Sequence, residues 1–233
     1  MTKTQLVALI VPLLWMAQFT DARPVTIKAP DGLTLHADYH APSSAGAPAV
    51  LLLHQLYTDR TSWDDLIPEL QAQGYAVMAP DLRGYGQSRG AIGWREAQRD
   101  TLLWLDWLRA QPEVNGGRIA IAGSSMGANL AVIGCADDTL REGGCITAVA
   151  ISPGLNYFGY TPLSPSLGAL AGREVLFISS ERDGYPARAV HELSAAFPGV
   201  TPLWVAGNAH GVDLFDSDET LIPAVIHWFN QHL

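Results

Sequence analysis

The stretch Gly123-Ser124-Ser125-Met126-Gly127 decides the fold expected for this chain. The largely apolar run at 118–122 has the composition of a buried strand, and the run at 128–133 has that of a helix. A strand that turns sharply into a helix through G-x-S-x-G is a nucleophile elbow, whose central serine sits in a strained backbone. The flanking glycines carry no Cβ, so strand and helix can pass closely. The pattern predicts Ser125 as a nucleophile, although a bare G-x-S-x-G also occurs by chance.

The segments around this stretch alternate between strand and helix patterns. The runs at 25–29 and 33–39 flank Pro30-Asp31-Gly32 and predict an antiparallel hairpin. Further strands are expected at 49–53, 75–79, 146–151, 174–179 and 201–205, and helices at 63–73, 96–110, 186–196 and 219–232. Such strand–helix repeats predict an α/β fold with a doubly wound, mostly parallel sheet and helices on both faces.

The segment between the strands at 146–151 and 174–179 bears on access to the site. It holds about 22 residues, is rich in Gly, Pro and Ser, and shows no sustained helical period. We therefore expect no large cap domain. Aromatic residues in the loops, namely Tyr57, Tyr157 and Phe158, are the candidates for substrate binding at the mouth of the site.

Composition narrows the class of protein. The chain has 233 residues, 48% of them hydrophobic, and a formal net charge of −9. The length and apolar content fit one globular domain with a sizeable core. The acidic balance argues against a nucleic-acid partner, which normally meets a basic face. The expected partner is a small-molecule substrate.

The first 22 residues differ from the rest. Lys3 precedes an apolar run of 14 residues at 6–19, and Thr20 and Ala22 place small residues before Arg23. This pattern is typical of a secretory signal peptide, which would leave 23–233 as the mature domain. The expected location is then periplasmic or secreted, without stable membrane insertion after cleavage. An uncleaved membrane anchor and an ordinary terminal helix are the alternatives.

The two cysteines, Cys135 and Cys145, lie close together in the sequence. In an oxidising compartment they could form a disulfide that closes a short loop. The alternative is a pair of free, partly buried thiols. Their spacing is not C-x-x-C, which argues against a redox or metal role.

A serine nucleophile needs a base, and the base needs an acid that orients it. His210 follows the strand at 201–205, and Asp183 follows the strand at 174–179. In a doubly wound sheet these positions meet at the carboxyl ends of the strands, where ligands bind. The order Ser125, Asp183, His210 is the nucleophile–acid–base order of this arrangement. Glu181 is the rival acid.

The oxyanion of the reaction needs two backbone N–H donors. One is expected at Met126, and the other in the loop at 54–57. Asp213, Asp216 and Asp218 resemble a metal cluster only loosely and are more typical of the polar approach and cap of a helix. No metal and no organic cofactor are expected.

Five segments together resemble the α/β-hydrolase superfamily, and most of all its lidless, dienelactone-hydrolase-like serine carboxylesterases. The segments lie at 51–55, 81–88, 123–127, 180–183 and 209–211. The resemblance implies Ser125, Asp183 and His210 as the triad, and the N–H groups of Leu56 and Met126 as the oxyanion donors. Gln55 stands where the family usually has glycine, and dienelactone hydrolases themselves use a cysteine nucleophile.

The expected function is therefore a serine hydrolase that cleaves carboxylic esters through an acyl-enzyme, with short-chain or small aromatic substrates. An amidase, peptidase or thioesterase would use the same triad, and no sequence feature separates these from an esterase. A non-catalytic binding protein on this fold is a further alternative, because fold does not fix function.

Overall fold

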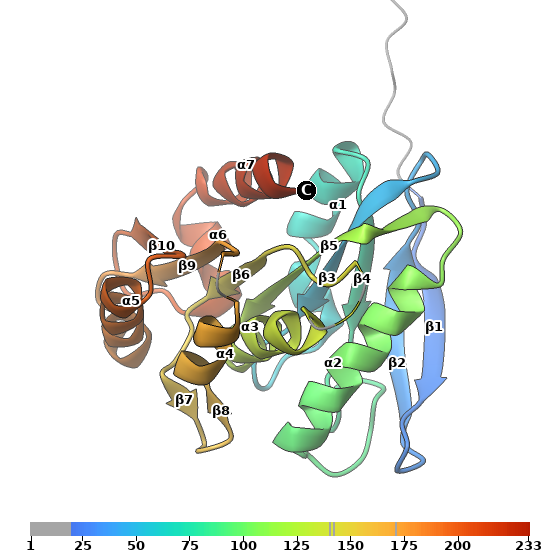
Figure 1. Cartoon of the computed structure of the whole chain (residues 1–233), viewed down its shortest axis with the longest axis horizontal. Coiled ribbons are helices and arrows are strands. Elements are labelled where there is room, and N and C mark those ends of the chain that lie inside the picture. The colour runs from blue at the N-terminus through green and yellow to red at the C-terminus, as the bar shows by residue number, and fades with distance from the viewer. Residues whose placement is uncertain (1–19, 140, 142, 171) are drawn as a thin grey trace, which may run out of the picture.

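The computed structural model describes residues 20–139, 141, 143–170 and 172–233 and is built on an eight-stranded sheet (Figure 1). The strand order is β1-β2-β4-β3-β5-β6-β9-β10. The strands are β1 (Arg23–Lys28), β2 (Thr34–His40), β3 (Ala47–Leu53), β4 (Ala76–Pro80), β5 (Val114–Ser124), β6 (Ala148–Ile151), β9 (Val175–Ser180) and β10 (Val200–Val205). Strand β2 runs antiparallel to β1 and β4, and the remaining pairs are parallel. The expected hairpin and the mostly parallel sheet are confirmed.

Helices cover both faces of this sheet, as expected. The helices on one face are α2 (Trp94–Arg109), α3 (Met126–Asp138), α4 (Leu163–Ala169) and α5 (Gly184–Ala196). Those on the other are α1 (Leu66–Ala72), α6 (Leu214–Ser217) and α7 (Leu221–His232), with the 3₁₀ turns η1 (Arg60–Trp63) and η2 (Gly211–Asp213). Strand β3 shows the alternation that creates two cores: Leu51 and Leu53 join the first cluster, and Val50 and Leu52 join the second.

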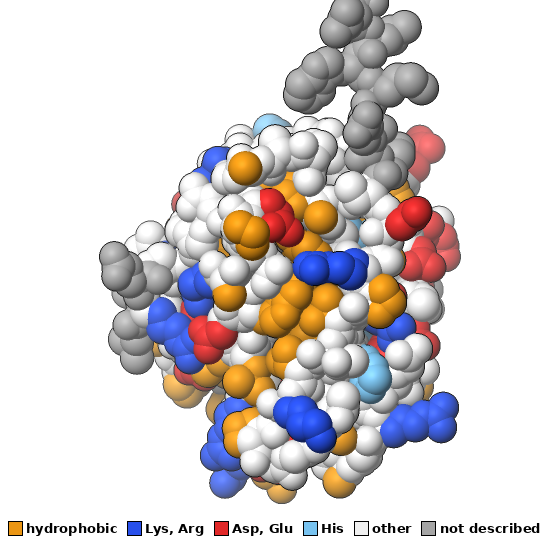
Figure 2. Space-filling model, turned by 90° about the vertical axis from the view of Figure 1, so that its right-hand side faces the viewer, with side chains coloured by type: hydrophobic (Ala, Val, Ile, Leu, Met, Phe, Trp, Pro, Cys, Tyr) orange, Lys and Arg blue, Asp and Glu red, His pale blue; other side chains and the backbone are white. Residues whose placement is uncertain are grey.

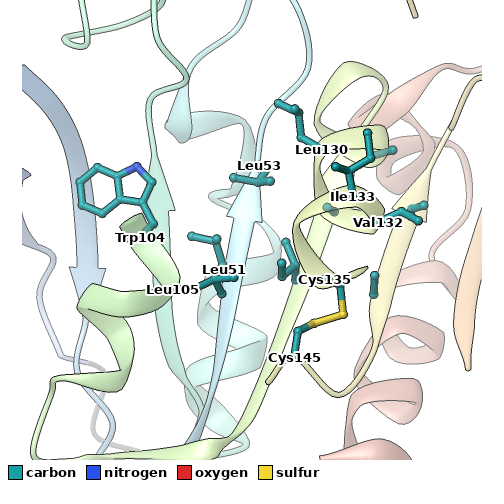
Figure 3. Close-up of a cluster of buried hydrophobic side chains, with 14 of the residues drawn as sticks. Leu51, Leu53, Trp104, Leu105, Leu130, Val132, Ile133, Cys135 and Cys145 are labelled. Carbon is teal, nitrogen blue, oxygen red and sulfur yellow. A yellow bond between two sulfur atoms is a disulfide. The ribbon is translucent and has the colours of Figure 1, made fainter. Parts of the chain in front are cut away.

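The core on the α2–α3 side holds helix α3, which follows Ser125, in place. Leu51 and Leu53 of β3 lie between Trp104 and Leu105 of α2 and the apolar side chains of α3 (Figure 3). Helix α3 is buried along almost its whole length. Each such side chain contributes about 1.5–3 kcal/mol when fully removed from water. Helix α3 is therefore fixed by packing over the centre of the sheet.

Cys135 and Cys145 form a disulfide, which settles the alternative left open by the sequence. The bond joins the last turns of α3 to the segment that leads into β6, and both sulfurs are buried (Figure 3). A bridge over a separation of 10 residues stabilises the fold by about 2–3 kcal/mol, chiefly by restricting the unfolded chain.

The outer edge of the sheet, with β1, β2 and α2, faces the viewer in Figure 2. Hydrophobic side chains gather along the middle of this face, with charged side chains around them. The Arg23 guanidinium lies 5.1 Å from the ring centre of Tyr39 and 5.5 Å from that of Trp107. Such cation–π contacts cover part of the apolar surface at the sheet edge.

The prediction that a helix begins at residue 63 is wrong, because α1 begins at Leu66. The structure has η1 and then α1, and Asp59 caps η1 by accepting a hydrogen bond from the N–H of Thr61. Pro68 accounts for the break, because proline is tolerated only in the first turn of a helix. Starting at Leu66 places Pro68 in that turn.

The segment expected to lack a helix is also more ordered than predicted. It forms the two-stranded ribbon of β7 (Asn156–Tyr157) and β8 (Thr161–Pro162), followed by the short helix α4. Leu163 and Leu167 of α4 are buried one turn apart, a spacing that the surrounding Ser, Pro and Gly residues obscured. The segment is still too short for a large cap domain, and none is present over the described residues.

The apolar run of the expected signal peptide, at 6–19, lies outside the described residues. Across the part of the chain that the structure describes, no helix combines the length and the apolar character needed to span a bilayer.

Candidate active site

Ser125 sits between β5 and α3 in a strained conformation, with φ 52° and ψ −115°. Close packing of β5 and β3 against α3 maintains this conformation. A Cβ on Gly123 would lie 2.0 Å from the Gly127 carbonyl oxygen, and one on Gly127 would lie 2.1 Å from the Leu53 oxygen. Only glycine fits at either position, so the small residues of the motif have the role that the pattern predicts.

The structure brings the three residues of the predicted triad into one hydrogen-bonded series. His210 Nε2 lies 2.8 Å from the Ser125 hydroxyl, and His210 Nδ1 lies 2.8 Å from Asp183 Oδ2. Ser125 is buried and 7% exposed, whereas the His210 side chain is 40% exposed. With Nδ1 donating to the carboxylate, Nε2 is free to accept the serine proton. A substrate can reach this group from the histidine side.

The neighbouring Ser124 has a different environment. It is fully buried, and its hydroxyl donates a hydrogen bond to Gln55 Oε1 at 2.7 Å. The rival acid Glu181 is exposed on the surface. The arrangement therefore selects Ser125 and Asp183 over their sequence neighbours.

Sequence analysis did not find Ser152, which joins two parts of this site. Its hydroxyl donates to Asp183 Oδ2 at 2.8 Å and accepts from the N–H of Gly211 at 2.9 Å. Ser152 follows β6 and has φ 52°, a conformation that no sequence pattern signals for serine. Its position at the carboxyl end of a parallel strand was the available clue.

Two further side chains hold the backbone on either side of His210. Ser180 Oγ donates to the Ala209 carbonyl at 2.7 Å, and the N–H of Val212 donates to Gln55 Oε1 at 3.0 Å. Gln55 thereby links the histidine loop to Ser124, and through it to the end of β5. Gln55, the residue that departs from the family pattern, thus supports the loop that carries His210.

One predicted oxyanion donor, Met126, lies at the start of α3, and the other, Leu56, lies in the loop at 54–57. As the first residue of α3, Met126 has a backbone N–H without an intrahelical acceptor. A Cβ on Gly127 would lie 2.5 Å from the His54 carbonyl oxygen, so the loop at 54–57 contacts the start of this helix. Leu56 is partly buried against the core in that loop. The loop that contains Leu56 therefore adjoins the start of α3, and the role of the two donors belongs to the proposal below.

His54 anchors the same loop as a buried, neutral side chain. Its Nε2 accepts a hydrogen bond from the N–H of Leu82 at 2.9 Å, and its Nδ1 lies 2.7 Å from the Gln55 carbonyl. These partners define the tautomer that carries its proton on Nδ1. Burial lowers the pKa of His54 below its ordinary value of 6.5.

The three predicted substrate-binding residues lie at different depths. Tyr57 is 91% exposed and contacts little of the site. Tyr157 is close to the triad: its hydroxyl donates to the Ser152 carbonyl at 3.0 Å. Burial raises the pKa of Tyr157 to about 12, and its interaction with the Ser125 hydroxyl acts against this shift. Phe158, the next residue in the chain, is 58% exposed.

Two of the three aspartates before the final helix, Asp213 and Asp218, lie at or near the start of a helix. Asp213 occupies the N-cap position of α6, and Asp218 accepts hydrogen bonds from the N–H and hydroxyl of Thr220. Thr220, not one of the aspartates, is the N-cap residue of α7. Within the described ranges, no three His, Cys, Asp or Glu side chains converge in a way that could hold a metal ion.

The pH dependence of stability should carry the signature of His54. Because its pKa is lowered in the folded protein, the unfolded chain takes up a proton first as the pH falls below about 6.5. The free energy of unfolding should therefore decrease from pH 7 to pH 5, and His54→Gln should flatten that slope while lowering stability throughout. Urea titrations across this range measure both effects. His227→Gln, at an exposed site, serves as the control, and parallel curves for wild type and His54→Gln would contradict the assignment.

Replacing Ser152 by alanine should slow the reaction of Ser125 with a fluorophosphonate probe by about tenfold, the equivalent of one hydrogen bond to a charged group. The reason is that Asp183 and Gly211 lose a shared partner. The labelling rate should also change its pH profile. Ser179→Ala is the matched control, since this buried hydroxyl donates to the Ser180 carbonyl. Equal labelling rates in the two variants would remove Ser152 from the site.

The family model of the X-Pro dipeptidyl-peptidase (S15) family matches residues 31–171, a range that contains Ser125 and ends before Asp183 and His210. An uncharacterized protein of Mycobacterium tuberculosis is 34% identical over 111 residues, which is 47% of this chain and 40% of that protein. The chain thus spans about two fifths of the length of the first curated relatives that it matches.

Two solved structures show the same fold over nearly the whole chain. The Pyrococcus furiosus esterase Pf2001 has a TM-score of 0.73 at 21% identity, covering 91% of this chain and 93% of the other. A dienelactone hydrolase from Anabaena variabilis has a TM-score of 0.73 at 15% identity, covering 91% and 98%. The fold is therefore that of the α/β hydrolases. The family match over more than half of the sequence shows that this chain belongs to the X-Pro dipeptidyl-peptidase (S15) family of α/β hydrolases.

Proposed function

We propose that this protein is a serine hydrolase that cleaves carboxylic esters. The observation that carries the proposal is the position of His210, whose two ring nitrogens lie 2.8 Å from the Ser125 hydroxyl and 2.8 Å from Asp183 Oδ2. This is the spacing that general-base activation of a serine requires.

The reaction proceeds through an acyl-enzyme. His210 takes the proton of Ser125 as its oxygen attacks the ester carbonyl carbon, and Asp183 stabilises the imidazolium that forms. The tetrahedral intermediate collapses, the C–O bond to the alcohol breaks, and His210 gives its proton to the departing alkoxide. Water then attacks the acyl-enzyme in the same way, releasing the acid and restoring Ser125.

The negative oxygen of each tetrahedral intermediate needs fixed donors. We assign the backbone N–H groups of Met126 and Leu56 to this role, because the loop at 54–57 contacts the start of α3. The helix N-terminus adds a favourable dipole. Losing one such donor typically costs about 10²–10³ in rate.

A peptidase is the second candidate, because the matching family model describes X-Pro dipeptidyl-peptidases. Esters remain the first choice on chemical grounds. An alkoxide leaves more readily than an amide nitrogen, so the acyl-transfer groups described above suffice for ester cleavage. A dipeptidyl-peptidase must in addition bind the free amine of its substrate.

Hydrolysis of p-nitrophenyl esters from acetate to palmitate tests the proposal. We expect turnover of the short-chain esters by the mature protein and a loss of about 10³-fold or more in Ser125→Ala, which removes the nucleophile. Ser179→Ala is the matched control and should retain turnover, because this buried hydroxyl donates to the Ser180 carbonyl.

Alanyl-prolyl p-nitroanilide assayed in parallel separates the two candidates. A higher kcat/KM for the anilide than for every ester would favour the peptidase. Absence of turnover on both substrate classes, with no difference between wild type and Ser125→Ala, would overturn the hydrolase proposal itself.

We also propose that the protein acts in an oxidising compartment, after export and removal of residues 1–22. The buried Cys135–Cys145 disulfide supports this location, because such bonds persist outside the reducing cytosol. Sequencing of the N-terminus of the exported protein should begin at Arg23. An intact Met1 in the exported fraction would contradict cleavage.

A further inference from the structure

The ribbon of β7 and β8 ends in a turn with an unusual residue at its tip. The N–H of Tyr160 donates to the Tyr157 carbonyl at 3.1 Å, and the two central residues, Phe158 and Gly159, have φ values of 52° and 77°. Hairpin turns with positive φ at both central positions strongly favour Asn, Asp or Gly at the first of them. A phenylalanine at this position is strained, so the turn itself does not explain why phenylalanine occurs there.

Burial of Phe158 in the core does not explain its presence either. Phe158 is 58% exposed, a large fraction for an aromatic side chain. One face of its ring stacks on Trp94, at the start of α2, with ring centres 5.7 Å apart and planes 9° apart. More than half of the side chain therefore stays accessible to a ligand despite this contact.

The stacked pair belongs to a series of rings that leads back to the triad. The rings of Phe158 and Tyr157 have centres 6.4 Å apart, and Tyr157 meets Tyr185 edge to face at 5.6 Å. Tyr157 is tied to the site by its hydrogen bond to the Ser152 carbonyl. The ribbon of β7 and β8 and the N-terminal end of α2 lie on the same side of the molecule, at the bottom of Figure 1. An aromatic surface therefore extends outward from the reacting groups.

This ribbon is fixed to the helix that carries the nucleophile. Asn129, fully buried in α3, donates to the carbonyls of Gly154 and Thr161 at 2.9 and 2.8 Å. It also accepts from the N–H of Gly154 at 2.9 Å. The ring series thus keeps its position relative to Ser125 before any substrate arrives, which reduces the entropy lost on binding.

We propose that Tyr157, Phe158 and Trp94 form a binding subsite for an aromatic ring of the substrate, with that ring stacked on the exposed side chain of Phe158. The inference rests on the proposed function and narrows it to esters that carry an aromatic group. The ring sits on the acyl or on the alcohol side of the ester. Stacking between rings favours such esters over aliphatic ones of similar size.

The test compares three esters by pH-stat: methyl butanoate, methyl phenylacetate and benzyl acetate. In Phe158→Asn, KM should rise about three- to tenfold for a ring-bearing ester and stay within about twofold for methyl butanoate. The melting temperature should hold or rise, because asparagine suits the turn better than phenylalanine. If KM rises for methyl phenylacetate alone, the ring binds on the acyl side of the ester; if KM rises for benzyl acetate alone, it binds on the alcohol side. Either result, or a rise for both esters, supports the subsite.

Two matched variants complete the experiment. Phe158→Tyr should restore the low KM, because it keeps the ring. Tyr160→Asn removes an aromatic residue of the same turn whose ring lies instead near the Arg95 guanidinium, at 5.8 Å, and should leave all three KM values unchanged.

The outcomes that overturn the proposal are distinct. An equal rise in KM, or an equal fall in kcat, for all three esters in Phe158→Asn would mean that the residue has a structural role only. Unchanged KM values for both ring-bearing esters would likewise overturn the subsite. If the wild type cleaves methyl butanoate under either result, the esterase function stands and the subsite alone fails. If the wild type cleaves none of the three, the proposed function fails and the subsite with it.

Discussion

The contact between the end of β3 and the first turn of α3 is the constraint on which the rest of the site depends. Gly127 packs against the carbonyl oxygens of Leu53 and His54 at distances that exclude any Cβ. This contact forces Ser125 into its strained conformation and brings the loop at 54–57 beside it. One packing contact therefore positions both the proposed nucleophile, Ser125, and the loop of its proposed oxyanion donor. Buried side chains on both faces of β3 support this contact.

The proposed base, His210, depends on a different kind of support. His210 lies in a loop without a regular element of its own, and the backbone around it is held by the side chains of Ser180, Ser152 and Gln55. Each comes from the carboxyl end of a different strand. A partly exposed histidine can thus keep its two 2.8 Å contacts through polar bonds to its neighbours rather than through its own burial.

The sequence was sufficient to predict the sheet and the turn at Ser125, because these depend on periodicity and on residue type. It also named Ser125, Asp183 and His210, which the structure brings into hydrogen-bond distance. Ser152 was missed because its role arises from a left-handed backbone and from a partner 31 residues away, Asp183. The start of the helix expected at 63–73 was wrong because Pro68 and Asp59 outweighed its apolar spacing. Helix α4 was missed because two buried leucines carry it in a segment of loop-like composition.

The disulfide gives α3 a second fixed end. At its N-terminus the helix abuts β3 through Gly127, and near its C-terminus Cys135 is bonded to Cys145, which precedes β6. A helix held at both ends cannot slide along its axis to release the strain at Ser125. The disulfide thus helps to hold the proposed nucleophile in its strained conformation from the far end of the helix. A reducing environment would remove this restraint without changing Ser125, Asp183 or His210.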